Sequence, residues 1–96
     1  MDDSSIMLTM LKTDLGIMTS TAYDTRLTQL LVAAEKAIKA EGATTLSTSD
    51  PLDQELIVLY AAWLWRRRDS MEGMPRMLRW KLNNRIFGPK AGGSDG

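Results

Sequence analysis

The sequence predicts a small all-α protein, a single-domain bundle of about four helices. Three observations carry this prediction. Apolar residues recur every three or four positions along several segments, a spacing that indicates helices with a buried face. No segment shows the alternation of apolar and polar residues that is typical of strands. A chain of 96 residues is long enough for one domain with a modest core.

The first two helices are predicted in the N-terminal half. Ser4 or Ser5 can cap the first one, and Gly16 is suited to end it because glycine readily adopts the left-handed conformation found after helices. The second runs from about Ala22 to Glu41, with leucine, alanine and isoleucine at helical spacing. Gly42 ends the pattern, and the hydroxyl-rich residues after it predict a loop.

The start of the third helix has the strongest boundary signal in the chain. Asp50 is a favoured N-cap residue, and Pro51 fits the first helical position. From Leu56 to Trp65 the helix is apolar on every side, a pattern that predicts a position surrounded by other helices. Three arginines, residues 66–68, follow at its negative end, where the helix dipole favours cations.

The fourth helix is predicted to begin at Pro75, after a turn over residues 70–74, and to end near Phe87. Gly88 and Pro89 are expected to stop it. Residues 88–96 are small and polar and are expected to form a disordered tail. The predicted division is therefore a helical domain over residues 1–87 and a tail over 88–96.

The predicted core joins the apolar positions of the last three helices. Its members are Leu27, Leu31, Leu56, Leu59, Tyr60, Trp63, Leu64, Leu78, Leu82 and Ile86. The fourth helix carries a second apolar stripe, formed by Trp80 and Phe87 and lying about 140° around the helix from the aliphatic one. Either a neighbouring subunit or the first helix would have to cover it, and the pattern alone does not choose between them.

The charge is unevenly distributed, although the net charge is zero. Residues 1–60 hold nine acids and four bases, whereas residues 61–90 hold two acids and eight bases. Such a split arises by chance in short chains, or it lets the acidic part of one copy meet the basic part of the next. The second interpretation predicts an interface formed by Arg76, Arg79, Trp80, Arg85 and Phe87 on one side and by Asp24 and Glu35 on the other.

Composition argues against catalysis and against a membrane span. The chain has no histidine and no cysteine, and its aspartates have no partner base, so we expect no enzymatic activity, no cofactor and no metal. The longest apolar run is ten residues, about half of what a bilayer requires, so we expect a soluble protein. The arginine run suits nucleic acid, but it is better explained by the helix dipole in a chain without general basicity.

The order of motifs resembles that of the small head-tail connector, or adaptor, proteins of tailed bacteriophages and prophages. The resemblance covers about residues 6–87 and depends on spacing rather than on a catalytic fingerprint. It is carried by Asp14-Leu15-Gly16-Ile17, by Asp24, Arg26-Leu27, Leu31 and Ala34, by Asp53 and Leu59-Tyr60-Ala61-Ala62-Trp63-Leu64, and by Met74-Pro75-Arg76-Met77-Leu78 with Asn83-Asn84-Arg85.

This resemblance implies a structural protein of the virion neck that is made in the host bacterial cytoplasm. Connectors of this family are helical, form rings of about a dozen copies, and bind a portal protein on one side and a stopper or tail protein on the other. A channel for DNA runs through the ring, so a non-specific DNA contact is compatible with this role. The alternative is a small DNA-binding module whose fourth helix enters the major groove.

Overall fold

The computed structural model describes residues 2–68 and 73–95, and this part of the chain contains four helices and no strand. These helices are α1 (Asp3–Leu15), α2 (Asp24–Ala40), α3 (Pro51–Arg67) and α4 (Arg76–Asp95). The prediction of a small all-α bundle is therefore confirmed. The turn expected over residues 70–74 falls mostly outside the described residues.

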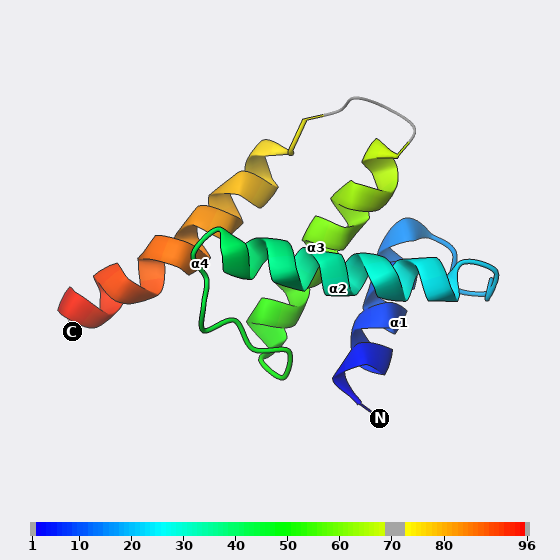
Figure 1. Cartoon of the computed structure of the whole chain (residues 1–96), viewed down its shortest axis with the longest axis horizontal. Coiled ribbons are helices and arrows are strands. Elements are labelled where there is room, and N and C mark those ends of the chain that lie inside the picture. The colour runs from blue at the N-terminus through cyan, green and yellow to red at the C-terminus, as the bar shows by residue number, and fades with distance from the viewer. Residues whose placement is uncertain (1, 69–72, 96) are drawn as a thin grey trace.

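Helix α3 is the centre of the fold, because each of the other three helices packs against it. Figure 1 shows α2 crossing in front of α3, while α1 and α4 flank α3 on opposite sides. The molecule measures 46 × 35 × 19 Å, so it is flat, with α4 along one side. A small flat bundle leaves much helix surface exposed, and this shapes the candidate site described below.

The N-cap of α1 lies two or three residues before the predicted one. The helix is capped by Asp2, not by Ser4 or Ser5, and the Asp2 carboxylate accepts a hydrogen bond from the Ser5 backbone N–H at 2.8 Å. Aspartate caps helices as well as serine does, so residue type alone could not place the boundary. At the other end, Gly16 has a φ of 74° and ends α1 as predicted.

Helix α3 begins where the sequence indicates. The Asp50 carboxylate accepts hydrogen bonds from the backbone N–H groups of Leu52, at 2.8 Å, and Asp53, at 3.3 Å. Pro51 occupies the first turn, where its missing N–H leaves no helical hydrogen bond unmade. The prediction for this boundary is confirmed.

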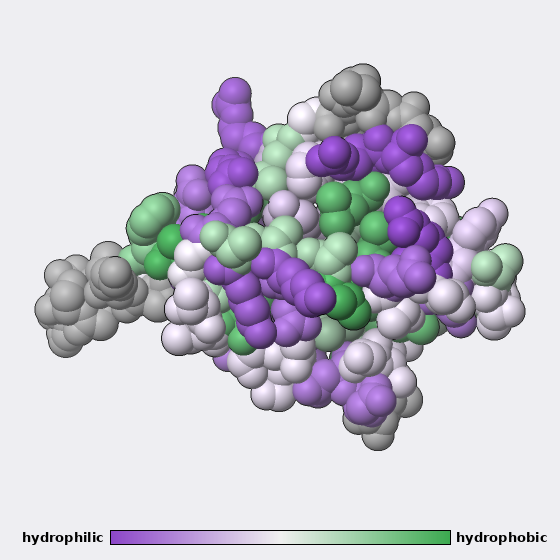
Figure 2. Space-filling view, viewed as in Figure 1, coloured by the Kyte–Doolittle hydropathy of each residue, from purple (hydrophilic) through white to green (hydrophobic). Residues whose placement is uncertain are grey.

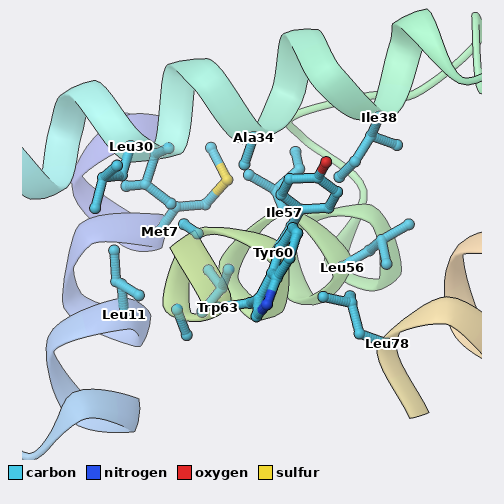
Figure 3. Close-up of a cluster of buried hydrophobic side chains, with 14 of the residues drawn as sticks. Met7, Leu11, Leu30, Ala34, Ile38, Leu56, Ile57, Tyr60, Trp63 and Leu78 are labelled. Atoms are coloured by element: carbon cyan, nitrogen blue, oxygen red, sulfur yellow. The ribbon is translucent and has the colours of Figure 1, made fainter. Parts of the chain in front are cut away.

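One continuous hydrophobic core joins all four helices, and Figure 3 shows its side chains converging between α1, α2 and α3. Ile57 is fully buried on α3 beneath α2, and Tyr60 and Trp63 extend the cluster along the same helix. The predicted core residues that the structure buries are Leu27, Leu31, Leu56, Tyr60, Trp63, Leu78 and Leu82.

Three predicted core residues, Leu59, Leu64 and Ile86, are only partly buried at the edge of the core, so their assignment to the interior is corrected. Ile86 lies on α4 beside Gly42, at the edge of the core. For the two residues on α3, the error came from treating that helix as surrounded on every side. Leu52 lies seven residues before Leu59, on the same helix face, and its residue surface is 77% exposed. Because only three other helices pack on α3, one stripe of it faces solvent.

The end of α2 carries a glycine that the packing of α4 requires. Gly42 has a φ of 131°, which side chains other than glycine rarely adopt. A Cβ atom at this position would lie 3.1 Å from the Cγ2 atom of Ile86, closer than most real contacts allow. Gly42 therefore turns the chain and leaves space for α4 at the same point.

Helix α4 does not end at Gly88 and Pro89, so that prediction is wrong. The helix continues to Asp95, and Figure 1 shows its last turns projecting beyond the other helices. A proline inside a helix removes one backbone hydrogen bond, here the one to the carbonyl of Arg85, but the helix can continue past it. Gly88 and Pro89 are unfavourable residues for a helix, as the sequence indicates, but they do not end α4.

We expect deletion of residues 88–96 to leave the melting temperature nearly unchanged. Residues 88–95 project away from the core, and the deleted segment contains four glycines, so it has few groups to offset the entropy lost on ordering. Thermal unfolding followed by circular dichroism tests this. A deletion that begins at Arg85 is the control and should be strongly destabilising, because it also removes Ile86 from the core edge. A large loss from the shorter deletion would contradict the prediction.

Candidate interaction surface

Helix α4 exposes three large apolar side chains on the side that faces away from the bundle. Leu78 and Leu82 are buried against the rest of the protein. On the opposite side of the helix, Met77, Trp80 and Phe87 are 62%, 60% and 63% exposed. At 100° per residue, these three positions share one face. Helix α4 is therefore apolar on two sides and covered on one.

We define the α4 outer face by its six exposed residues, which are Arg76, Met77, Trp80, Asn83, Asn84 and Phe87. It holds three large apolar side chains, two amides and one guanidinium, and no carboxylate. Figure 2 shows hydrophobic residues at the surface beside the projecting end of α4. A groove of about 280 Å³ extends this face toward α3, between Trp80 and the exposed Leu52. Aromatic and arginine residues on such a face are typical of protein interfaces.

The structure decides between the two explanations of the aromatic stripe. The first helix was one candidate to cover Trp80 and Phe87, but α1 packs against α2 and α3 on the far side of the molecule. Both aromatic side chains remain exposed within the chain. Coverage by α1 is therefore excluded, and coverage by a partner remains as a prediction.

The basic side chains predicted to face a neighbour mostly have partners within the chain. The Arg79 guanidinium lies 2.8 Å from a Glu41 carboxylate oxygen, and the Arg85 guanidinium lies 2.7 Å from an oxygen of Asp53. Both arginines are therefore paired within the fold, and their role in an intermolecular interface stays a prediction. Arg76 differs from them, since it forms no ion pair with any residue that the structure describes.

The predicted acidic partners are also engaged within the chain. A carboxylate oxygen of Asp24 lies 2.9 Å from the ammonium group of Lys12, a lysine that is 9% exposed. Glu35 pairs with Lys39 one helical turn later, at 3.0 Å. The Lys12 pair ties α1 to the start of α2, so Asp24 has a structural role within the fold, and its interface role stays a prediction. The Glu35 pair is an ordinary helix-surface contact and leaves this carboxylate accessible.

The three arginines at the end of α3 contact other residues of the same chain. Arg66 lies 3.5 Å from an oxygen of Asp14. The guanidinium of Arg67 lies 5.0 Å from the ring centre of Trp63, and that of Arg68 lies 3.8 Å from the ring centre of Trp65. Cation–π contacts and the helix dipole account for these residues without a nucleic acid.

The strongest polar cluster joins α3 to α4 and is called here the Asp53 clasp, formed by Thr45, Ser47, Asp53 and Arg85. Arg85 donates to both carboxylate oxygens of Asp53, at 2.7 and 3.2 Å, and also to the Thr45 hydroxyl. The Ser47 backbone N–H donates to the same carboxylate at 2.9 Å. Sequence reasoning treated Asp53 only as a helix-start residue and missed this contact, because nothing in the sequence pairs residues 53 and 85.

The clasp shifts the titration of its carboxylate. Burial by itself would raise the pKa of Asp53, which is 4% exposed, but the hydrogen bonds from Arg85 and Ser47 outweigh burial and lower that pKa below its usual value. The same contact raises the pKa of the Arg85 guanidinium, so both groups stay charged. This is a structural ion pair that fixes the angle of α4, and with it the direction of the α4 outer face.

In residues 2–68 and 73–95, we find no group of three or more acidic, histidine or cysteine side chains able to hold a metal ion. Within the same residues, no helix combines the length and the hydropathy that crossing a bilayer requires. In comparisons with known proteins, no family model matches the chain, and no curated protein or solved structure shows significant similarity to it. The case for function therefore depends on the geometry of this chain.

Proposed function

We propose that this protein is a structural interaction protein, a head-tail connector that forms a ring in the neck of a tailed-phage virion. In this role it binds copies of itself, a portal protein on one side and a stopper or tail protein on the other. The order of motifs along the chain supports the family, and the surface of the fold supports the kind of function. The proposed site of action is the virion neck.

The observation that carries this proposal is the α4 outer face. Three large apolar side chains, each about 60% exposed, lie on one face of this helix. Large apolar side chains exposed together on one face are typical of sites where proteins associate. The clasp between Asp53 and Arg85 holds the face in one orientation, and a rigid surface loses less entropy on binding than a mobile one.

A DNA-binding role for α4 has less support. The major groove is read by basic and amide side chains that are free to reach phosphates and bases. On α4, Arg79, Lys81 and Arg85 are each paired with an acid of the same chain. A short DNA duplex at physiological salt should therefore remain unshifted at micromolar protein concentrations. A clear shift would favour the DNA-binding alternative.

We expect Trp80→Ala to weaken self-association strongly and to leave the melting temperature of the monomer within a few degrees of the parent. The side chain is 60% exposed, so its loss removes interface area and leaves no cavity in the core. Sedimentation velocity over a wide concentration range and thermal unfolding measure the two effects separately.

Met18→Ala is the matched control, because Met18 is 51% exposed on the loop before α2, away from α4. It should change neither quantity. If Trp80→Ala lowers the melting temperature as a core substitution does, Trp80 belongs to the subunit. If it leaves association unchanged, the α4 outer face is not the assembly surface. A portal gene and a capsid gene beside this one would support the neck assignment, and unrelated neighbours would argue against it.

A further inference from the structure

A second accessible concave surface lies between α1 and α2, away from α4. This α1–α2 groove has a volume of about 250 Å³ and is lined by Asp3, Ser4, Met7, Thr28, Leu31, Val32, Glu35 and Thr48. Met7 and Leu31 are each 4% exposed and form its apolar base, whereas Val32 is 48% exposed at its edge. The groove therefore has an apolar base and polar residues around it.

The charge of the groove is negative. Asp3 accepts a hydrogen bond from the Thr48 hydroxyl at 3.3 Å and forms no ion pair with any residue that the structure describes. Glu35 has Lys39 as a neighbour, but this is a partly exposed pair four residues apart on one helix, and pairs of this kind contribute little. Two carboxylates therefore face one ammonium group at this site. The α4 outer face has the opposite imbalance, because Arg76 lacks a carboxylate partner in the described chain.

We propose that the α4 outer face of one copy binds the α1–α2 groove of the next copy, with Trp80 over Val32 and Arg76 beside Asp3 and Glu35. This inference depends on the proposed function and names the surface that meets α4 within the ring. Shape and charge both support it, since a projecting aromatic residue meets a groove and a guanidinium meets carboxylates. The sequence-based idea of head-to-tail charge pairing is retained with Glu35, but with Arg76 in place of Arg79 and Arg85.

The positions of the two surfaces favour a head-to-tail contact. Figure 1 places α4 on one side of α3 and α1 on the other, so the two surfaces lie on different parts of the molecule. Contacts between unlike surfaces repeat from copy to copy, and they form a ring when the rotation closes. A pair of α4 helices from two copies would instead form a closed dimer with two arginines and no acid in the contact.

The size of the surface predicts a weak contact in the free protein. The α4 outer face spans residues 76–87, a length of about 17 Å at the helical rise. Such a face buries well below the roughly 800 Å² per partner of a stable complex. We therefore expect association of the isolated protein only at high concentration, so the test has to trap short-lived contacts.

The chain has no cysteine, so introduced cysteines are its only thiols. We would prepare Met77→Cys and Val32→Cys separately, one with a tag that changes its mobility, and treat them alone and mixed with a short bis-maleimide cross-linker. The head-to-tail model predicts a mixed covalent dimer at high concentration and little product from either variant alone. Gel electrophoresis gives the yield.

Ala33→Cys replaces Val32→Cys as the control. Both residues are exposed on α2, but Ala33 lies 100° further around the helix, on the flank away from the groove. Its mixed yield with Met77→Cys should be several-fold lower. In a second stage, Arg76→Glu added to the Met77→Cys chain should lower the mixed yield, and Glu35→Arg in the Val32→Cys chain should restore part of it.

The outcomes separate this inference from the proposed function. Efficient cross-linking of Met77→Cys with itself would establish an α4–α4 dimer and overturn the inference, while the α4 outer face would remain an assembly surface. A mixed yield no higher than that of the Ala33→Cys control would also overturn it. Failure of the proposed function would appear elsewhere, as self-association that is unaffected by Trp80→Ala.

Discussion

Ile57→Ala should lower the free energy of unfolding by about 2–5 kcal/mol, the range measured when a large aliphatic side chain is removed from a packed core. Ile57 is fully buried on the central helix, beneath α2, so its loss leaves a cavity that few neighbours can fill. Small domains have only about 5–15 kcal/mol of stability in total. Urea unfolding followed by circular dichroism measures the loss, and partial unfolding in the absence of urea is an expected extreme.

Leu59→Ala is the matched control, two residues further along α3. Leu59 is only partly buried, on the side of α3 that carries the exposed Leu52. Less apolar surface returns to water and no closed cavity forms, so we expect a loss of about 1–2 kcal/mol. Equal losses for the two variants would show that α3 is enclosed on all sides, as the apolar pattern from Leu56 to Trp65 suggested.

The fold class could be predicted because local signals agreed with the final packing. The cap at Asp50, the glycine after α1 and the helical spacing of leucines along α2 each depend on residues close in sequence. Predictions failed where a neighbour distant in sequence decides the outcome. The partial exposure of Leu59 depends on how much of α3 the helix α4 covers, and no local pattern contains that information.

The same distinction between local and distant contacts explains why only part of the candidate site could be predicted. Two apolar stripes on α4 could be seen from helical periodicity, so the exposed positions of Trp80 and Phe87 were within reach of the sequence. The ion-pair partners of the basic residues on α4 could not be predicted from the sequence. Arg85 meets Asp53 across 32 positions and Arg79 meets Glu41 across 38, pairings that only the packing of the helices determines.

Asp53→Asn should cost about 2–4 kcal/mol, the scale for breaking a buried ion pair whose remaining partner keeps some access to water. The substitution keeps the side-chain volume. It replaces the carboxylate, which accepts hydrogen bonds from Arg85 on both of its oxygens, with an amide. The Arg85 guanidinium, whose side chain is 20% exposed, then has no charged acceptor in the clasp. Urea unfolding at neutral pH measures the cost.

Glu55→Gln is the control, because Glu55 lies on the same helix and pairs with Lys81 of α4 at 3.3 Å. Both of these side chains are well exposed, at 53% and 36% respectively. Exposed pairs of this kind contribute about 0–1 kcal/mol, so the variant should be nearly as stable as the parent. Similar losses for Asp53→Asn and Glu55→Gln would mean that burial of the clasp adds nothing to the attachment of α4.

The stabilisation by Asp53 should also depend on pH, with a sign fixed by its lowered pKa. An unfolded aspartate has a pKa of about 3.9, so the clasp contributes fully above that value and loses its contribution as the pH falls through the lower folded pKa. Protonated Asp53 resembles asparagine in charge and shape. The stability difference between the parent and Asp53→Asn should therefore be constant from about pH 5 upward and shrink below about pH 4. A difference that is unchanged in acid would show that the substitution acts through lost packing, because a contribution from the charged pair must disappear with the charge.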